Sequence, residues 1–281
     1  MRKSIVATLF LCLLFSCKGG KIEELLDFDD EEEVADSVEA FVGDTLHLFD
    51  EPEEPPVTVD ELFDDFLYNF MEDAKFQGQR IAFPLPCRDG EEVEPLDKQE
   101  WAHHNRFHKL EFYSFIYERE QDFQLTKDTA ARSVDVEWID LQNERMEKFL
   151  FNRQEGRWML TGVEKERNDN TPNGDFLKFY AKFVNDSIFQ RESLAQPVRL
   201  ILTSEDGEEE PQEEWLSPDD WSSMRGDLPL SAKQLVNIDY GQAIISQNRK
   251  TLLIEGASNG FMMKFTFDKR GDDWKLIEME Y

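Results

Sequence analysis

The pattern of hydrophobic and polar positions predicts a helix followed by several strands, and the same succession occurs twice along the chain. In the first succession, apolar residues recur every fourth position, as on one face of a helix: Leu62, Phe66, Phe70 and Ala74. Thr58 and Glu61 have the spacing of a capping box that would begin this helix. The helical pattern continues through Asp73 and ends before Pro84.

Strand-like patterns follow this helix. They form four segments of alternating or continuously apolar residues: 110–117, 134–138, 146–151 and 158–163. Gln154, Glu155 and Gly156 supply a turn between the last two segments. Residues 58–168 are therefore expected to form a helix that packs on a β-sheet.

A second helix and a second set of strands are predicted further along. Asp175 is expected to be the N-cap of this helix, whose inward face is apolar: Phe176, Tyr180, Phe183 and Val184. Three closing strands follow at 251–254, 261–267 and 274–279, with a turn at 270–272. The acidic stretch from Glu205 to Glu214 is interpreted as a solvated loop.

An internal repeat relates the two successions. The first block holds phenylalanines, an aspartate, a Phe-Gln pair and a proline: Phe66, Phe70, Asp73, Phe76, Gln77 and Pro84. The same residue types recur 113 positions later: Phe179, Phe183, Asp186, Phe189, Gln190 and Pro197. A second block, from Lys148 to Leu160, recurs 116 positions later from Lys264 to Leu276. Two blocks in the same order predict two copies of one domain, at 58–168 and 169–281.

Each copy, a helix followed by a long sheet that closes with a tryptophan strand, resembles the nuclear transport factor 2-like (cystatin-like) fold. The resemblance implies the α+β class: two tandem cone domains, each with N-terminal helices packed on a curved antiparallel sheet. The phenylalanine, aspartate, Phe-Gln and proline motifs are also similar to those of a family of envelope lipoproteins from gut anaerobes with no established activity. The fold by itself implies no activity, because it hosts enzymes, binding modules and assembly domains.

The first residues resemble the signal peptide of a bacterial lipoprotein. Arg2 and Lys3 precede an apolar run, 5–15, that is too short to span a bilayer. The run ends at Ser16 and Cys17 in a motif that resembles a lipobox, so residues 1–16 are expected to be removed and Cys17 to be lipidated. Because Cys12 leaves with the signal peptide, Cys87 stays without a disulfide partner.

Charge and composition restrict the kinds of partner that the protein can bind. The formal net charge is −30, which repels nucleic acid and anionic headgroups, so the lipid anchor is expected to hold the protein on the membrane. Much of the acidity lies in residues 17–57, which are interpreted as an extended, lipidated linker. The expected location is the cell envelope, most simply the outer membrane, facing the periplasm or the cell surface.

Few residues of the sequence are candidates for catalysis, metal binding or ligand binding. Asp73 and Asp186 could act as pocket bases, but their presence in both copies favours a structural role. His103, His104 and His108 form a histidine cluster in the first copy, yet no third ligand has matching spacing, so no metal site is predicted. Residues considered for binding are Asp73, Arg80, Trp101, His104, His108, Trp215 and Trp221. Trp158 and Trp274 occupy equivalent repeat positions and are expected in the core.

Three functions remain open at this point. The leading hypothesis is a binding protein without enzymatic activity or cofactor, which takes a small ligand or an envelope protein in a cone mouth or in the groove between the copies. The alternative is an enzyme with one active cone pocket, in which Asp73 or the histidine cluster supplies acid-base chemistry. A purely structural module, whose cones are filled by their own aromatic side chains, is the third.

Overall fold

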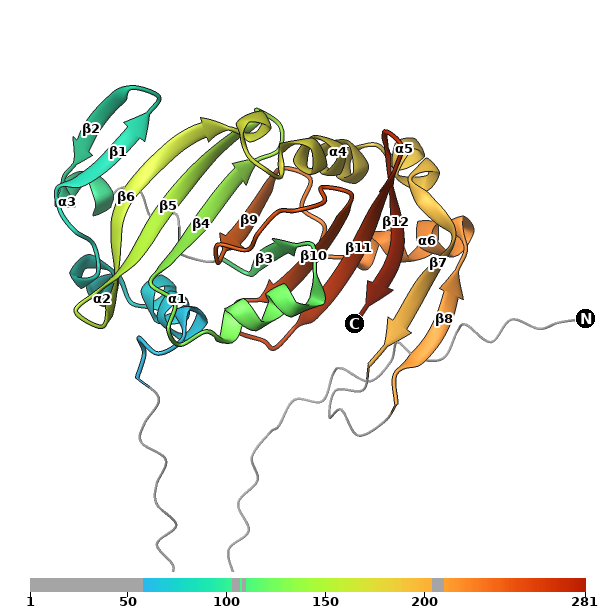
Figure 1. Cartoon of the computed structure of the whole chain (residues 1–281), viewed down its shortest axis with the longest axis horizontal. Coiled ribbons are helices and arrows are strands. Elements are labelled where there is room, and N and C mark those ends of the chain that lie inside the picture. The colour runs from blue at the N-terminus through green and yellow to red at the C-terminus, as the bar shows by residue number, and fades with distance from the viewer. Residues whose placement is uncertain (1–57, 103–106, 108–109, 204–209) are drawn as a thin grey trace, which may run out of the picture. The chain divides into compact units, whose positions relative to one another are not determined.

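The computed structural model describes residues 58–102, 107, 110–203 and 210–281. These residues lie in one compact unit that spans 54–281 (Figure 1). We refer to 58–168 as the N-terminal half and to 169–281 as the C-terminal half. The expectation that these ranges are separate domains stays a prediction, as does the linker at 17–57, which lies outside the described residues.

The same order of α-helices and strands occurs in both halves, while the 3-10 helices differ in position. The N-terminal half contains α1 (Phe63–Glu72), α2 (Ala74–Gln79), β1 (Leu85–Asp89), β2 (Glu92–Leu96), α3 (Lys98–Ala102), β3 (Phe112–Tyr117), η1 (Glu120–Lys127), β4 (Ser133–Asp140), β5 (Arg145–Gln154), β6 (Arg157–Arg167) and η2 (Asn168–Asn170), the last crossing the boundary. The C-terminal half contains α4 (Gly174–Asn185), α5 (Ser187–Glu192), β7 (Leu194–Leu202), β8 (Gln212–Leu216), α6 (Pro218–Met224), η3 (Arg225–Asp227), β9 (Gln234–Asp239), β10 (Arg249–Gly256), β11 (Met262–Arg270) and β12 (Asp273–Glu280).

The helix boundaries correct several expectations. The capping box at Thr58 and Glu61 is wrong, because the N-cap of α1 is Leu62, which makes no side-chain cap. Asp73 does not lie within a helix: the chain turns extended there, and Asp73 caps α2 by accepting the N–H groups of Lys75 and Phe76. An extended residue whose carboxylate accepts two N–H groups starts a new helix, and Asp73 therefore breaks the predicted one in two.

The C-terminal half shows the same capping with one further correction. Asp186 caps α5 by accepting the N–H groups of Ile188 and Phe189, at 3.0 Å each. Asp175 is not the N-cap of α4; that residue is Asn173, and Asp175 instead accepts the indole N–H of Trp274 at 2.9 Å. The repeated aspartate thus has one local role in both halves, the start of a second short helix.

The strands of the described residues all belong to one 12-stranded sheet, in the order β2-β1-β6-β5-β4-β9-β3-β10-β11-β12-β7-β8. The sheet is mixed rather than wholly antiparallel, because β1 and β6, β7 and β12, and β3 and β9 are parallel pairs. The interpretation of Glu205 to Glu214 as a loop is wrong at its end, where Glu213 and Glu214 belong to the edge strand β8. Residues 205–209 of this stretch lie outside the described residues.

The third strand of each half is exchanged with the other half. β9 pairs with β4 along its whole length, and β3 pairs with β10 along its whole length. The end of each exchanged strand is held by the half that receives it. Tyr240, which follows β9, donates a hydrogen bond to the carboxylate of Asp64 on α1, while Glu118, which follows β3, accepts from Lys250 at 3.1 Å.

Two hydrophobic cores lie on opposite faces of this sheet. Successive residues of a strand point to opposite faces, and on β3 Phe115 and Tyr117 pack in the core beneath α1, whereas Ile116 packs in the core beneath α4. Leu252 and Leu253 of β10 divide between the cores in the same way. The central strands therefore contribute to both cores, which explains why β9 and β10 are buried on both faces.

Within the part of the chain that the structure describes, no helix is long and apolar enough to cross a membrane. No group of three or more histidine, cysteine, aspartate or glutamate side chains in that part could hold a metal ion.

Candidate functional site

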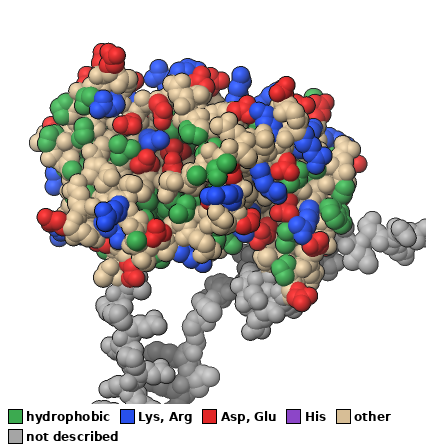
Figure 2. Space-filling view, in the orientation of Figure 1, with side chains coloured by type: hydrophobic (Ala, Val, Ile, Leu, Met, Phe, Trp, Pro, Cys, Tyr) green, Lys and Arg blue, Asp and Glu red, His purple; other side chains and the backbone are tan. Residues whose placement is uncertain are grey.

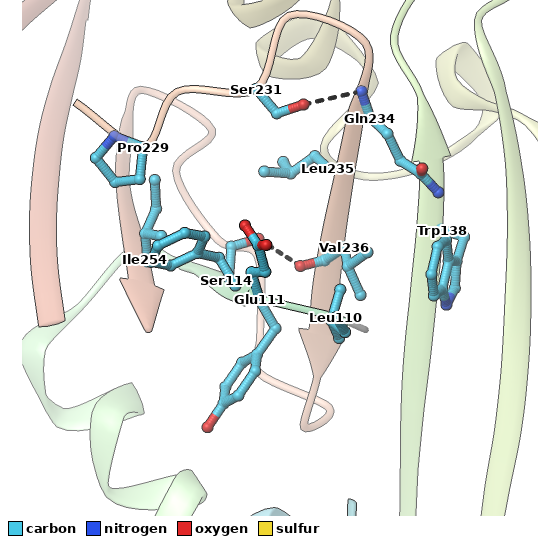
Figure 3. Close-up of a pocket in the computed structure, with 12 residues that line it drawn as sticks. Leu110, Glu111, Ser114, Trp138, Pro229, Ser231, Gln234, Leu235, Val236 and Ile254 are labelled. Atoms are coloured by element: carbon cyan, nitrogen blue, oxygen red, sulfur yellow. Dashed lines mark hydrogen bonds between the residues drawn. The ribbon is translucent and has the colours of Figure 1, made fainter. Parts of the chain in front are cut away.

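A cavity of about 450 Å³ opens where β3 and β9 separate at the centre of the sheet. We call it the central slot. Its lining comes from both halves of the chain: Leu110, Glu111, Phe112, Tyr113, Ser114, Trp138, Pro229, Ser231, Gln234, Leu235, Val236 and Ile254. Pro229 and Ile254 lie on one side and Trp138 on the other, with Leu235, Val236 and Glu111 between them (Figure 3).

The slot exists because the two exchanged strands hardly pair with each other. Each is fully occupied on its outer side, β3 by β10 and β9 by β4. Between them, the structure pairs only Ser114 with Asn237. Towards the N-terminal ends of both strands, beyond this bridge, their facing edges border the cavity rather than one another.

Side-chain hydrogen bonds add to the single backbone bridge where the slot closes. Asn237, fully buried, accepts the N–H of Ile116 at 2.9 Å and donates to Glu137 at 2.8 Å. The hydroxyl of Ser114 donates to the carbonyl oxygen of Val236 at 2.9 Å (Figure 3). Because a buried amide must satisfy both of its ends, this network fixes the separation of β3 and β9 at the closed end.

Glu137 is an acid in an unfavourable environment for its charge. The pKa of Glu137 is raised to about 7, because burial and nearby Asp239 raise it more than Asn237 and Lys148, 3.5 Å away, lower it. Because the folded-state pKa lies above the ordinary value of 4.5, the carboxyl group keeps a proton between about pH 4.5 and pH 7 that it has lost in the unfolded chain. The stability that this proton contributes is present at low pH and is lost as the pH rises towards 7.

Replacing Glu137 with glutamine is therefore expected to flatten the pH dependence of stability. Relative to the Glu137→Gln protein, the wild type should lose up to about 3 kcal/mol of unfolding free energy between pH 4.5 and pH 8. Urea unfolding at both pH values measures this difference, and Glu91→Gln in an exposed turn is the matched control. If the unfolding free energies of the wild type and the Glu137→Gln protein changed equally with pH, the raised pKa of Glu137 would be contradicted.

The slot is mainly apolar inside a strongly charged surface. Glu111 is the only charged residue among the described residues that line it, and the others are aliphatic, aromatic, serine or glutamine. On the face of the molecule in Figure 2, by contrast, acidic and basic side chains are mixed with small hydrophobic areas. A concave, mostly apolar site with a few polar groups is the usual composition of a ligand pocket.

The family described as "Domain of unknown function (DUF4348)" matches residues 44–281. The chain belongs to this family. A solved structure, the crystal structure of an NTF2-like protein from Bacteroides fragilis NCTC 9343, is 35% identical in sequence, with a TM-score of 0.72. The match covers 81% of this chain and 98% of that one. No protein with a curated description matches.

These comparisons confirm the expected fold class, α+β and NTF2-like, and the resemblance to an NTF2-like family of gut anaerobes. In the described part of this DUF4348 chain, aromatic rings fill the core beneath α1: Phe63, Phe66, Phe70, Phe107, Phe151 and Trp158. Trp158 and Trp274 are both buried, as expected.

Among the described residues, none of the binding candidates from the sequence lines the central slot of this NTF2-like protein. Asp73 is an exposed helix cap. Arg80 forms two hydrogen bonds with Asp60, at 2.7 and 2.8 Å, and its guanidinium lies over the ring of Phe76, 4.6 Å from its centroid. Both side chains therefore have structural partners, and a binding role for either stays a prediction.

The three candidate tryptophans lie in different environments. Trp101 on α3 is buried and donates its indole N–H to Gln77, the glutamine of the repeated motif, at 2.9 Å. Trp221 on α6 is also buried, but neither its indole N–H nor the side-chain oxygen of Gln190, the equivalent glutamine, has a hydrogen-bond partner among the described residues. Trp215 is 63% exposed on the edge strand β8. Their binding roles stay predictions.

His103, His104 and His108 lie outside the described residues, as does Cys17. The residues that do form the slot were not identified from the sequence as a site. Leu110 and Ile254 were recognised only as strand residues, and β9 was not predicted at all. The available signal was a short apolar stretch, Leu235 to Ile238, interrupted by an asparagine that has no reason to be buried unless it pairs with something.

Proposed function

We propose that this protein is a lipid-anchored binding protein of the cell envelope, without enzymatic activity, that takes an apolar ligand in the central slot. The observation that carries the proposal is the slot itself: a cavity of about 450 Å³ between two exchanged strands, lined mainly by apolar side chains from both halves. This is the groove between the copies that the sequence raised as a binding place. A cavity of this size is within the range of small-molecule sites.

The cellular part of the proposal is supported by the sequence. Arg2, Lys3, the apolar run and Cys17 together resemble a lipoprotein signal, and the acidic residues after Cys17 would extend away from a membrane by self-repulsion. Two or three acyl chains on Cys17 would anchor the protein durably. The outer membrane is the proposed location.

The proposal also holds that 58–168 and 169–281 are two copies of one NTF2-like unit. The recurring motifs support this, as does the shared order of α-helices and strands in the two halves. A slot between exchanged strands needs both copies, because each contributes one of the two strand edges.

The uncharged dye N-phenylnaphthylamine, whose fluorescence rises in apolar surroundings, tests the binding site. We expect it to bind the purified protein, and Gln234→Trp to weaken binding at least about tenfold. Gln234 is exposed and lines the slot, so an indole there would fill the cavity without disturbing a core.

Ile245→Trp is the matched control, since it adds an indole at a position 66% exposed that does not line the slot. Equal dye affinity in the Gln234→Trp and Ile245→Trp proteins would show that the dye binds elsewhere and would refute the proposal.

A further inference from the structure

We infer that the C-terminal half carries a binding site for a guanidinium group, in the place where the N-terminal half holds its own arginine. The site is a cavity of about 440 Å³, lined by residues of α4, of α5 and of the turn and first residues of β12. We call it the α4–α5 pocket. It shares no lining residue with the central slot, so it does not depend on the function proposed for that slot.

The first observation is that Ser193 and Arg80 occupy equivalent positions. Ser193 lies 113 residues after Arg80, the same offset that relates the repeated motifs just before them. Their backbones also make the same hydrogen bond. The carbonyl oxygen of Arg80 accepts the N–H of Leu160 at 2.8 Å, and the carbonyl oxygen of Ser193 accepts the N–H of the repeat-related Leu276 at 2.8 Å. One position therefore carries a guanidinium group and its equivalent carries only a hydroxyl.

In the N-terminal half, two rings and a carboxylate hold the guanidinium of Arg80. Its central carbon lies 4.6 Å from the ring centroid of Phe76 and 5.9 Å from that of Phe66. The guanidinium also forms two hydrogen bonds with the carboxylate of Asp60, at 2.7 and 2.8 Å. Arginine suits such a place, because its planar group stacks on aromatic faces and binds a carboxylate through two N–H groups at once.

The second observation is that the C-terminal half keeps the rings without the arginine. Phe179 and Phe189 lie 5.8 Å apart at an interplanar angle of 58°, against 5.9 Å and 53° for the pair that holds Arg80. Both rings line the α4–α5 pocket, together with Trp274 and Ser193. Because serine is much shorter than arginine, the space beside the rings that a guanidinium fills in one half is open in the other.

A carboxylate is also present in the pocket. In the N-terminal half, Asp60 accepts the backbone N–H of Trp158 at 2.8 Å. In the C-terminal half, Asp175 lines the pocket and accepts the indole N–H of Trp274 at 2.9 Å. The ammonium group of Lys269 donates to the same oxygen of Asp175, Oδ2, at 2.8 Å. The other oxygen, Oδ1, accepts no hydrogen bond from the described residues and is available to a ligand.

The charges around the pocket favour a cation. Four carboxylates and three lysines are among the described residues that line it, on a chain of formal net charge −30. The ammonium group of Lys182 already lies 3.9 Å from the ring centroid of Phe189, which shows that this ring attracts a cation. Lys182 is exposed, and its ammonium group is more strongly hydrated than a guanidinium. A guanidinium is therefore the better partner for the ring and would displace Lys182.

Capped tripeptides test the inference on the intact protein. Acetyl-Gly-Arg-Gly-amide presents a guanidinium, and the same peptide with citrulline presents a neutral group of nearly the same shape. We expect the arginine peptide to shift the nuclear magnetic resonance signal of the Trp274 indole N–H saturably, and the citrulline peptide to bind at least about tenfold more weakly. Equal binding of the two peptides would overturn the inference.

Agmatine, a small free guanidinium compound, distinguishes the two sources of such a group. If agmatine binds as tightly as the arginine peptide, the pocket takes a free small molecule. Tighter binding of the peptide would instead assign the pocket to an arginine side chain of a partner protein.

Ser193→Arg tests the equivalence of the two halves. The new guanidinium should fill the pocket as Arg80 fills its own place, so the arginine peptide should bind at least about tenfold more weakly. Ser187→Arg is the matched control, because it adds the same charge at an exposed position of α5 that does not line the pocket.

Phe189→Leu keeps the test independent of how well the Ser193→Arg protein folds. It removes one ring from the half-buried wall of the pocket and should weaken binding of the arginine peptide at least about threefold. Binding as tight as that of the wild type in both the Ser193→Arg and the Phe189→Leu proteins would show that the peptide binds elsewhere, and would refute the inference.

Discussion

Replacing Glu118 with alanine is expected to lower the free energy of unfolding by about 3–5 kcal/mol. The carboxylate accepts the backbone N–H groups of Ile245, Ser246 and Gln247 at 2.8–2.9 Å, and the ammonium group of Lys250 at 3.1 Å. Its side chain is 3% exposed and that of Lys250 is 1% exposed. The substitution would leave the buried charge of Lys250 and three N–H groups without their partner. These groups lie in the segment of the C-terminal half that contacts the end of β3.

The pKa of Glu118 describes the same environment. Burial alone would raise it, but the hydrogen bonds from Ser246, Ile245, Gln247 and Lys250 hold it at about 2. A folded-state pKa below the ordinary value contributes stability above pH 4.5 that is lost as the pH falls towards 2. This is opposite in sign to the contribution of Glu137.

Urea unfolding at pH 7 measures the effect, with two comparisons. Asp219→Ala breaks an exposed pair with Arg191 and should cost no more than about 1 kcal/mol. The double replacement of Glu118 by leucine and Lys250 by methionine removes both charges, and it should recover part of the loss. If Glu118→Ala costs as little as Asp219→Ala, the contact does not hold the exchanged strand.

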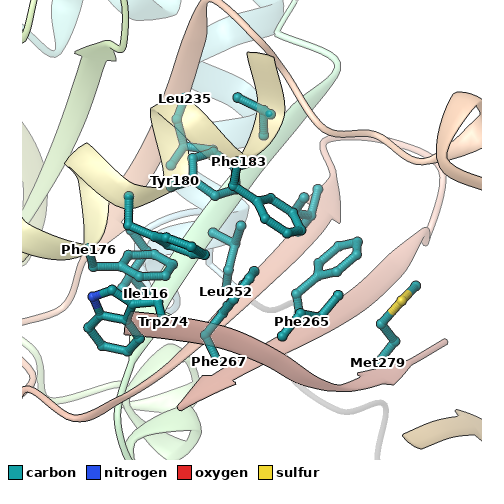
Figure 4. Packing of buried hydrophobic residues seen from close by; sticks show 14 of the residues in the cluster. Ile116, Phe176, Tyr180, Phe183, Leu235, Leu252, Phe265, Phe267, Trp274 and Met279 are labelled. Carbon is teal, nitrogen blue, oxygen red and sulfur yellow. The ribbon is translucent and has the colours of Figure 1, made fainter. Parts of the chain in front are cut away.

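Phe151→Ala and Phe267→Ala are each expected to cost about 3–5 kcal/mol. Phe151 is fully buried among the rings of Phe63, Phe66 and Phe70, at centroid distances of 5.3–5.6 Å. Phe267 has the corresponding place in the other core, where Figure 4 shows it beneath Phe176 and Phe183 on α4. Each substitution leaves a cavity that the surrounding rings cannot fill.

The more informative result is the number of unfolding transitions. Because β3 and β9 each contribute side chains to both cores, damage to one core should destabilise the other, and each variant should unfold in a single transition. Calorimetry of both variants measures this. Two separate transitions, only one of them shifted by each substitution, would show that the halves are independent in stability.

The sequence predicted those strands whose hydrophobic pattern is complete within a single stretch of chain. The strands β4, β5, β6, β10, β11 and β12 were all anticipated, because their alternation or continuous apolarity appears within a single stretch of chain. β1 and β2 were missed, since each is short and contains a proline or several charges. The exchange of β3 and β9 was beyond prediction, because no strand encodes its partner in its own pattern.

The site was less predictable than the fold for a related reason. Asp73 and Asp186 each cap a short helix, and their occurrence in both halves had favoured a structural role; a binding role for Asp73 stays a prediction. The slot, however, is made by the separation of two strands that are more than a hundred residues apart. Its residues are individually ordinary, and only their arrangement makes a cavity.

A crystal structure of the protein with N-phenylnaphthylamine bound tests the central claim most directly. Our account predicts that β3 pairs with β10, that β9 pairs with β4, and that the dye lies between Trp138, Leu235 and Ile254. Pairing of β3 with β4 inside the N-terminal half, with a closed sheet and no cavity at its centre, would contradict it.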